Sequence, residues 1–480
     1  MPNGMTVLDF VRYRQNLKGT KIGCREGDCG ACTILVGELL EGRVRYRTMT
    51  SCLMPLANAA GKHIVTIEGL NREGGSLTPV QQAVVDESGT QCGFCTVGFV
   101  MSLTGFLIGD DDKTPQSAVS SIDGNICRCT GYKSLERAAK RICMQPSDGA
   151  GAGASPENTT PAADDHLLIS RHIIPEYFAD IAERLAGLEQ PLPHFQDGAK
   201  MAFVGGGTDV YVQRPEEAAE TPAEHLLYQP HLRGIKEEDG FIEIGASATV
   251  TDLLESPLMN EFSPNLYKHL KLVSSTPIRN MATLAGNFAN ASPIGDLTVW
   301  FLALDAEIRL RNPKGGERLI PLRELYLGYK MLAKSQDEMI TAVRFKKFAG
   351  DFRFNFEKVC KRTYLDIASV NTALSLRLYE SGPPVPGILR GEVENPPSHI
   401  ETAFAAAGGV APIPLFLRET SAFLCGREVN RETLNKANEI MQAEISPISD
   451  VRGSREYKRL LLRQLFTAHF VEIFGSDALR

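Results

Sequence analysis

The chain has 480 residues, 43% of them hydrophobic and 23% charged, and a formal net charge of -7. This length allows about three domains of roughly 150 residues each. The acidic balance and the scattered Lys and Arg residues exclude the basic footprint of a nucleic-acid-binding protein. No apolar run approaches the roughly 18 residues of a membrane span, and the start lacks the features of a signal peptide. We therefore expect a soluble, cytoplasmic protein with neither a nucleic-acid nor a membrane partner.

Eleven cysteines are present, and most of them lie in the first 129 residues. This is not the density of a disulfide scaffold, and thiols stay reduced in the cytoplasm. Cys143, Cys360 and Cys425 stand alone along the chain, and we interpret them as ordinary buried small residues. The N-terminal cysteines need another explanation.

Residues 23–32, GCREGDCGAC, carry three of these cysteines, and residues 31–52 resemble a hairpin of β-rich strands that ends at a fourth. The C-x4-C-x2-C spacing followed by a distant fourth thiol is typical of a plant-type 2Fe-2S cluster. Gly23, Gly27 and Gly30 can take positive φ and let the backbone wrap closely around a cluster. A four-thiol zinc site is less consistent, because zinc ribbons usually present paired C-x2-C knuckles. The set is Cys24, Cys29, Cys32 and Cys52.

Residues 76–109 have helix-spaced apolar side chains and contain the pair QCGFC; a second pair follows in NICRC. The set is Cys92, Cys95, Cys127 and Cys129. Taken alone, two close pairs could also bind zinc, so that alternative stays open here. The flanking helical patterns place both pairs at helix ends, where backbone amides favour a negatively charged cluster. Two four-thiol sites side by side make more sense as an electron relay.

Residues 145–163 are rich in Gly, Ala, Ser and Pro and are predicted to form a flexible linker. After it, residues 200–212, KMAFVGGGTDVYV, look strand-like around a glycine-rich loop. Consecutive backbone N–H groups at Gly205, Gly206 and Gly207, with the hydroxyl of Thr208, suit a pyrophosphate. The position where the Rossmann pattern needs its third glycine holds Val210, so we reject a classical NAD fold. A glycine-rich turn between strands remains the alternative.

Further strand-like stretches lie at 240–250 and 304–311, and residues 249–262 resemble a helix. Between them, residues 276–296 combine small residues with hydrogen-bonding side chains, a combination that suggests a nucleotide cleft. The small residues are Ala285, Gly286, Ala289 and Ala291, and the polar ones are Thr283, Asn287, Asn290, Ser292 and Asp296. From about Phe352 strands alternate with helix, ending in a helical tail over 455–475. His63 and His231 are interpreted as surface or structural residues, and we name no catalytic side chain.

These elements, in this order, resemble the iron-sulfur and flavin part of the xanthine dehydrogenase family of molybdenum hydroxylases, as found in the small subunit of two-subunit bacterial enzymes. The resemblance rests on GCREGDCGAC with Cys52, QCGFCTVGFVMS, GNICRCTGY, VGGGTDV and ATLAGNFANASPIGD. It implies an α+β multidomain chain. Its expected parts are a β-grasp ferredoxin-like domain (1–66), a helical 2Fe-2S domain (67–144), a flexible linker (145–166), an α/β FAD-binding domain of the molybdenum hydroxylase flavoprotein type (167–348) and a small α/β C-terminal domain (349–480).

By this resemblance the first cysteine set ligates a 2Fe-2S cluster nearer the flavin, and the second set ligates one nearer a molybdopterin. Gln91 matches a family glutamine that approaches the pterin. FAD would lie between the VGGGTDV loop and the 283–296 segment, and Ser369 stands where relatives carry a lysine near the flavin. The implied FAD contacts are Val204, Gly205, Gly206, Gly207, Thr208, Asp209, Val210, Thr283, Gly286, Asn287, Asn290, Ser292, Asp296 and Ser369.

The start of the chain departs from the family pattern. Relatives usually carry a β-hairpin ahead of the segment that matches MTVLDFVRYR, whereas only five residues precede Thr6 here. Without that hairpin the ferredoxin-like sheet would expose an unpaired edge. We expect that the true start lies upstream, and that an extended chain would retain its cluster better than one starting at Met1; equal iron content in both would contradict this.

The resemblance also implies what lies outside the chain. Ending at Arg480, the chain leaves no room for a molybdopterin module, so molybdopterin is expected only in a large partner subunit, in a hetero-oligomer such as a dimer of heterodimers. A purine, hypoxanthine or xanthine, would be oxidised there, and electrons would pass through both clusters to FAD and on to NAD+. Alternatives are the equivalent subunit of an aldehyde or nicotinate-like N-heterocycle dehydrogenase, and a non-redox zinc-binding scaffold. The sequence leaves the choice between NAD+ and oxygen as acceptor open.

Overall fold

The computed structural model describes residues 4–143, 165–188, 202–348, 350–379 and 399–476. The chain forms two compact units: unit 1 comprises Met1–Leu227 and Ser275–Ala282, and unit 2 comprises Tyr228–Ser274 and Thr283–Arg480. Most of the predicted linker lies outside the described residues, and helix α6 (Asp165–Ser170) already begins within its last two residues. None of the described helices is long and apolar enough to cross a lipid bilayer.

Unit 1 contains a three-stranded antiparallel sheet with the order β2-β1-β3. Strands β1 (Thr33–Leu40) and β2 (Arg43–Thr50) pair from Thr33 opposite Thr50 to Leu40 opposite Arg43. The two-residue turn between them, Glu41 and Gly42, has positive φ at both positions, as a type I′ hairpin requires. The hairpin predicted over 31–52 is therefore confirmed.

Strand β3 (His63–Val65) is an edge of this sheet. A cavity of about 710 Å³ lies beside it, lined by apolar side chains that include Val11, Ile64 and Tyr177. The start of the described chain is helical: α1 (Val7–Asp9) continues into a π-helical turn over Phe10–Arg14.

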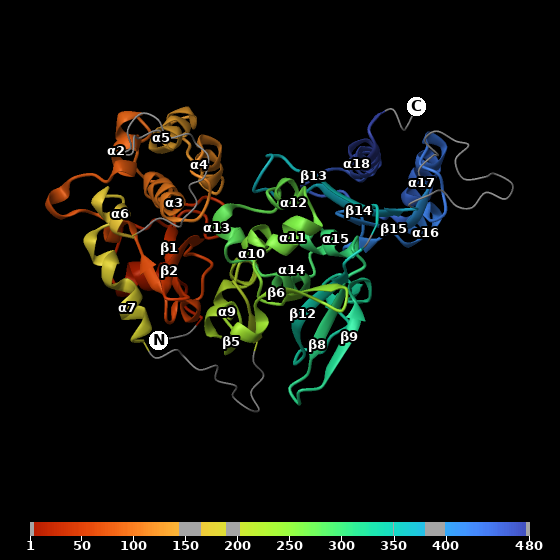
Figure 1. The fold of residues 1–480 in the computed structure, drawn as a ribbon, viewed down its shortest axis with the longest axis horizontal. Coiled ribbons are helices and arrows are strands. Elements are labelled where there is room, and N and C mark those ends of the chain that lie inside the picture. The colour runs from red at the N-terminus through yellow and green to blue at the C-terminus, as the bar shows by residue number, and fades with distance from the viewer. Residues whose placement is uncertain (1–3, 144–164, 189–201, 349, 380–398, 477–480) are drawn as a thin grey trace. The chain divides into compact units, whose positions relative to one another are not determined.

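Four helices of unit 1 surround one apolar core with the sheet: α2 (Pro79–Asp86), α3 (Thr96–Ile108), α4 (Pro115–Ser121) and α5 (Lys133–Cys143). They lie together in orange beside the red strands β1 and β2 in Figure 1. Helix α3 contacts α2, α4, β1 and β2, and its run from Gly98 to Phe106 is buried. A helix that is apolar on all sides belongs at such a centre.

The rest of unit 1 consists of short elements. Strand β4 (Ala202–Val204) pairs in parallel with β5 (Ala223–His225). The helices are α8 (Val210–Gln213) and α9 (Pro215–Glu220), which contact each other, α7 (Ile181–Ala186), which contacts β1 and β2, and α13 (Thr276–Arg279), which contacts β2. The expectation that 200–212 is strand-like on both sides of the glycine loop is wrong in its second half, because the chain turns into α8 after the loop.

Unit 2 contains a five-stranded antiparallel sheet with the order β6-β7-β12-β8-β9. Its strands are β6 (Ile235–Glu238), β7 (Phe241–Gly245), β8 (Glu307–Arg311), β9 (Glu317–Pro321) and β12 (Met339–Lys346). Alternate residues such as Ile242, Ile308 and Val343 are fully buried, as the two-residue period of a half-buried strand predicts.

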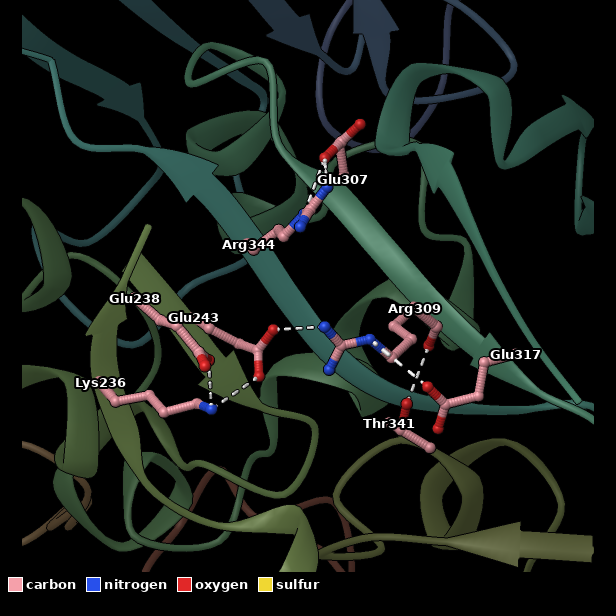
Figure 2. Close-up of polar contacts among 8 residues, drawn as sticks. All are labelled: Lys236, Glu238, Glu243, Glu307, Arg309, Glu317, Thr341 and Arg344. Atoms are coloured by element: carbon pink, nitrogen blue, oxygen red, sulfur yellow. Dashed lines mark hydrogen bonds and ion pairs between the residues drawn. The ribbon is translucent and has the colours of Figure 1, made fainter. Parts of the chain in front are cut away.

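Charged side chains from different strands pair with one another in this sheet (Figure 2). Glu243 on β7 lies 3.6 Å from Lys236 on the adjacent strand β6, and Arg309 on β8 reaches Glu243 over the intervening strand β12 at 2.6 Å. Arg344 on β12 pairs with Glu307 on β8 at 2.8 Å. Opposite charges on adjacent strands stabilise a sheet as cross-strand pairs. A polar cavity of about 410 Å³ lies among some of these residues, but its carboxylates are already paired with cations.

Five helices and a small hairpin accompany the five-stranded sheet in unit 2. The helices are α10 (Val250–Glu255), α11 (Pro257–Phe262), α12 (Leu266–Leu270), α14 (Leu284–Asn290) and α15 (Asp296–Leu302), and the hairpin pairs β10 (Tyr326–Gly328) with β11 (Met331–Leu332). The single helix predicted over 249–262 is two helices, because Ser256 ends one and caps the next ahead of Pro257.

A second sheet of unit 2 has the order β13-β14-β15-β16. Its strands are β13 (Phe352–Val359), β14 (Val370–Leu378), β15 (Ile400–Gly408) and β16 (Leu415–Phe416), and the helices are α16 (Arg418–Leu424), α17 (Arg431–Glu444) and α18 (Arg455–Phe474). These elements form the blue end of the ribbon in Figure 1. The predicted helical tail over 455–475 is confirmed.

The three isolated cysteines are not buried as expected. Cys425 is exposed, and Cys143 and Cys360 are partly exposed. Each thiol contacts a backbone carbonyl, such as that of Ser421 for Cys425 at 3.3 Å. A weak thiol donor near the surface is satisfied in this way without burial.

Candidate functional site

The first four cysteines come together as two pairs in unit 1. Cys24 and Cys29 share a hydrogen bond, which lowers the pKa of Cys24 to about 5 and raises that of Cys29. Cys32 and Cys52 share another, which lowers the pKa of Cys32 and raises that of Cys52. Cys32 and Cys52 are only 2% and 4% exposed, whereas Cys24 and Cys29 are partly exposed.

The loop that carries Cys24 and Cys29 directs backbone N–H groups at sulfur. The N–H of Cys24 lies 3.4 Å from Cys29 Sγ, and that of Glu26 lies 3.3 Å from Cys24 Sγ. Hydrogen bonds of this kind tune a bound iron-sulfur cluster. Because its backbone N–H groups point at thiol sulfurs, this loop is suited to hold such a cluster.

The glycines of this loop serve two different purposes. Gly27 and Gly30 have positive φ, as predicted. Gly23 does not; it is needed because a Cβ there would lie 2.6 Å from Cys29 Sγ. The sequence analysis missed Arg25, which has positive φ without being glycine and whose guanidinium is held 2.6 Å from Asp9.

The second four cysteines also form two pairs, and this site is more exposed. The sulfurs of Cys92 and Cys129 are 3.6 Å apart, and the thiols of Cys95 and Cys127 share a hydrogen bond. Cys92 and Cys129 are exposed, whereas Cys127 is buried. Cys95 directly precedes α3, in agreement with the helix-end prediction. Gln91 donates a hydrogen bond from Nε2 to the carbonyl oxygen of Cys129 at 3.3 Å.

Pairing of the thiols is informative about what they can hold. In a structural zinc site four ligands surround one ion tetrahedrally. A 2Fe-2S cluster has two irons that share four thiolates between them. The two-by-two arrangement at both sites fits the cluster.

The two cysteine loops are joined directly by hydrogen bonds. The N–H of Ile126, next to Cys127, donates to the carbonyl oxygen of Cys29 at 3.0 Å. Asn125 donates from Nδ2 to the carbonyl oxygen of Gly30 at 3.2 Å. This close approach depends on Gly98 of α3, since a Cβ there would lie 2.1 Å from that same oxygen. Sequence spacing alone did not predict this junction.

The glycine-rich loop of unit 1 offers backbone donors. Within the described residues, the N–H groups of Gly206, Gly207 and Thr208 have no hydrogen-bond acceptor, and neither does the Thr208 hydroxyl. Gly207 has positive φ. A Cβ at Gly206 would lie 1.9 Å from the carbonyl oxygen of Met281, so close backbone packing also demands this glycine. Three consecutive free N–H groups fit the predicted anion nest.

The polar segment over 283–296 belongs to unit 2, and most of its polar side chains contact the protein itself. Thr283 caps α14 by accepting from the N–H of Gly286 at 3.1 Å. The carbonyl oxygen of the Asn287 side chain accepts from both the N–H and the hydroxyl of Thr298. Asn290 accepts from Lys330 at 2.8 Å, and the hydroxyl of Ser292 accepts from the N–H of Ile294 at 3.4 Å. Gly286 is exposed.

Two residues that the sequence analysis did not single out fix the end of this segment. Lys358 on β13 and Asn371 on β14 each donate to a different oxygen of Asp296, at 2.7 and 2.5 Å. Their signal in the sequence was weak, because Lys358 stands in a strand, FRFNFEKV, in which other polar residues also occur. Ser369 is buried, and its hydroxyl donates to the carbonyl oxygen of Arg452 at 2.9 Å.

Comparison with known protein families agrees with these sites. A profile described as "2Fe-2S iron-sulfur cluster binding domain" matches residues 1–57 and one described as "2Fe-2S binding domain" matches 66–140. "FAD binding domain in molybdopterin dehydrogenase" matches 178–345 and "CO dehydrogenase flavoprotein C-terminal domain" matches 356–473. The chain thus has two 2Fe-2S domains, an FAD-binding domain and a flavoprotein C-terminal domain, which match the small 2Fe-2S and FAD subunit of the molybdenum hydroxylase family.

Individual proteins that are similar to this chain include xanthine dehydrogenases and CO dehydrogenase. The chain is 28% identical to xanthine dehydrogenase 1 of Arabidopsis thaliana, over 98% of this chain and 38% of that protein. It is 29% identical to xanthine dehydrogenase of Emericella nidulans, over 88% of this chain and 34% of that protein. The chain therefore spans little more than a third of these relatives. Among solved structures, a chain of reconstituted CO dehydrogenase from Oligotropha carboxidovorans is 25% identical with a TM-score of 0.50, over 58% of this chain and 90% of that one. The chain is therefore similar to xanthine dehydrogenases and to a chain of CO dehydrogenase.

Proposed function

We propose that this chain is the electron-transfer subunit of a xanthine dehydrogenase-like molybdenum hydroxylase, which passes electrons from a molybdopterin-binding partner to NAD+ during hypoxanthine or xanthine oxidation. The observation that carries the proposal is the joined pair of thiol sites: Ile126, beside one set, bonds at 3.0 Å to the carbonyl oxygen of Cys29 in the other. Two cofactors held on one continuous hydrogen-bonded framework suit a relay.

In this proposal Cys24, Cys29, Cys32 and Cys52 ligate one 2Fe-2S cluster, and Cys92, Cys95, Cys127 and Cys129 ligate the other. Clusters supply one-electron transfer, while the chain fixes their positions and tunes them through N–H···S bonds and burial. The exposure of Cys92 and Cys129 supports assigning the second site to the side that meets the partner. The first site, in which Cys32 and Cys52 are buried, is then assigned to the flavin side of the relay.

The flavin is assigned to the Val204–Val210 loop and to the polar segment over 283–296. FAD supplies the conversion between single electrons and hydride when bound. The free N–H groups of Gly206, Gly207 and Thr208 support a role in holding its pyrophosphate. NAD+ as acceptor, a purine as substrate and a dimer of heterodimers are part of the proposal because the relatives named above are xanthine dehydrogenases.

The test is to purify the full chain anaerobically and count iron, zinc and acid-released flavin per chain. Two 2Fe-2S clusters and one FAD, with absorption that bleaches on adding dithionite, are expected. The variant Cys52→Ala should lose half of the iron, and Cys425→Ala, which removes an exposed cysteine outside both sets, should lose none. Stoichiometric zinc without iron or flavin would contradict the proposal and support the scaffold alternative.

The substrate is tested separately with the co-purified partner. Reduction of NAD+ should follow addition of hypoxanthine or xanthine but not of an aldehyde or nicotinate. Turnover of an aldehyde alone would assign the chain to another member of the family and leave the electron-transfer role intact.

A further inference from the structure

The polar cavity of about 410 Å³ on the five-stranded sheet of unit 2 lies apart from the sites described above. Its charged lining residues include Glu243 and Arg309, which alternate along their strands with the buried Ile242 and Ile308. Successive side chains of a strand point to opposite faces, so the cavity lies on the face of the sheet away from the core. None of the described residues assigned to the clusters or to FAD lines it.

The hollow exists because small residues stand in the middle of the sheet. Gly245 on β7 pairs with Ala342 on β12, and Ala342 pairs in turn with Arg309 on β8. The next pair that faces the same way on β7 and β12 is Glu243 with Arg344, whose large side chains cover the sheet. The open space therefore lies over the Gly245–Ala342 pair.

The turn over residues 231–234 forms one wall of the cavity, and backbone contacts fix it. The carbonyl oxygen of Leu232 accepts from the N–H of Ser247 at 2.8 Å, and that of Gly234 accepts from the N–H of Gly245 at 2.9 Å. A Cβ at Gly245 would lie 2.3 Å from the carbonyl oxygen of Leu232, so this glycine lets the wall approach the sheet. The N–H of Gly234 has no acceptor within the described part of the chain.

The charges of the lining are unequal in number. Two carboxylates, Glu243 and Glu317, face four Lys or Arg side chains, which are Arg233, Lys236, Arg309 and Arg311. Figure 2 shows Arg309 between the two carboxylates, 2.6 Å from Glu243 and 3.7 Å from Glu317. Lys236 lies 3.6 Å from Glu243 and 2.6 Å from Glu238, which does not line the cavity. Both lining carboxylates are thus already compensated by cations.

Arg311 is the cation that these pairs leave over. It is exposed and has no hydrogen-bond or ion-pair partner among the described residues. It follows Arg309 by two positions in β8, so both guanidinium groups leave the same face of the sheet. Two neighbouring cations repel each other unless an anion compensates them, and the planar guanidinium fork matches the oxygens of a phosphate group.

We propose that this cavity is a binding site for a phosphate group, either free phosphate or the phosphate ester of a small metabolite. Arg311 is its principal cation, supported by Arg309 and by the N–H of Gly234. A phosphate group carries close to two negative charges above its second pKa of about 6, which suits the excess of cations. The volume lies within the range of roughly 300–1,000 Å³ that is usual for small-molecule sites, so an ester has room. The site needs neither cluster nor FAD, so it is independent of the proposed function.

The experiment titrates the full-length chain, purified with its cofactors, with inorganic phosphate and separately with glycerol phosphate in a calorimeter. A pH of about 8 keeps both probes dianionic, and an ionic strength of about 0.05 M limits screening. Arg311→Leu should weaken binding about tenfold or more, the effect of losing a charge-assisted hydrogen bond. Glu317→Gln should tighten binding, because it removes a carboxylate that faces the anion and releases Arg309.

Lys346→Leu is the matched control. Lys346 is an exposed cation on β12 of the same sheet and does not line the cavity. Its removal changes the net charge of the chain as much as Arg311→Leu does, and binding should stay the same. Because Glu317→Gln should act in the opposite direction, the test remains usable if Arg311→Leu fails to fold.

The two probes distinguish the sources of the phosphate group. Tighter binding of glycerol phosphate would support an ester as the ligand, and equal or weaker binding would support free phosphate. The proposal is wrong if neither probe binds, or if Arg311→Leu and Glu317→Gln alter the affinity no more than Lys346→Leu does. Phosphate bound at the glycine-rich loop of unit 1 would give that second result, since no variant changes the loop.

Discussion

Two buried histidines in unit 2 illustrate how single residues set the response of this protein to acid. His269 on α12 and His469 on α18 are both fully buried and meet the side chain of Asn355, at 3.3 and 3.0 Å. Burial lowers the pKa of His269 to about 4 and that of His469 to about 3. Both therefore stay neutral in the folded chain at pH values where an unfolded chain would protonate them.

Stability should fall as the pH drops from about 6.5 toward these lowered pKa values, because protons then bind the unfolded chain more readily. Between pH 7 and pH 5 the two histidines together should cost roughly 3–4 kcal/mol of unfolding free energy. The measurement is urea unfolding followed by the fluorescence of Trp300, the one tryptophan of the chain, which is buried in unit 2. His469→Gln should halve the loss, and His231→Gln, at an exposed histidine, should leave it unchanged. An equal loss of unfolding free energy in the unmodified chain and in both variants would show that groups other than His469 determine the acid sensitivity.

The sequence predicts a residue's role well when the residues that act together lie at characteristic short spacings along the chain, and poorly when only folding brings them together. The cysteine sets could be assembled from their spacing alone, since a cluster needs ligands at fixed intervals. Lys358 could not, because its partner Asp296 lies far away in the chain and only folding brings them to 2.7 Å. Asp296 was predicted as an FAD contact from its place in a small-residue segment, and in the structure its carboxylate accepts hydrogen bonds from Lys358 and Asn371.

Helix α3 shows at the next scale that a glycine can be required where alanine would ordinarily be better. Gly→Ala in a helix interior usually stabilises by about 1 kcal/mol. At Gly98 the sign should reverse, because a Cβ would lie 2.1 Å from the carbonyl oxygen of Gly30 in the first cysteine loop. Forcing atoms into a packed site typically costs about 1–3 kcal/mol.

Gly98→Ala should therefore lower the melting temperature at which the iron-sulfur absorbance is lost, and it should reduce the iron retained per chain. Gly187→Ala is the control, since its nearest atom would lie at 3.6 Å. Full iron content and an unchanged melting temperature in Gly98→Ala would mean that α3 can move away from the loop at no cost.

Elements with strong local signals were predicted, and elements decided by their surroundings were not. The β1–β2 hairpin follows from alternating residues around a Glu41-Gly42 turn. Helix α8 does not: Val210, Tyr211 and Val212 favour a strand by propensity, yet they form a helical turn after the glycine loop. Tertiary context commonly overrides weak propensity in such short segments. The break at Ser256-Pro257 was missed although its local signal is strong, because serine caps a helix and proline begins one.

At the scale of the whole molecule, unit 1 is built from two separated stretches of chain. Its second stretch contains α13, whose Arg279 pairs with Asp123 at 2.7 Å, and these side chains are 3% and 5% exposed. Asp123 also accepts from the N–H of Thr276 at 2.8 Å. A buried ion pair thus holds the returning segment in unit 1.

Breaking this pair on one side should be costly. Arg279→Leu leaves a buried carboxylate without its cation, a change that typically costs about 3–5 kcal/mol. Adding Asp123→Asn should recover much of the loss, whereas Arg214→Leu, at the exposed pair with Glu217, should cost less than about 1 kcal/mol. Chemical unfolding followed by the iron-sulfur absorbance checks this; equal midpoints for Arg279→Leu and Arg214→Leu would contradict it.

The returning segment also governs the order in which the nascent chain can fold. When Leu227 leaves the ribosome, unit 1 still lacks α13, and Tyr228–Ser274, which belong to unit 2, must be synthesised before Ser275–Ala282 appear. Until then Asp123 has no Arg279 to pair with. Unit 1 therefore cannot be completed as an independent N-terminal body during translation, and a gene cut after Leu227 would yield a fragment in which Asp123 lacks its ion-pair partner Arg279.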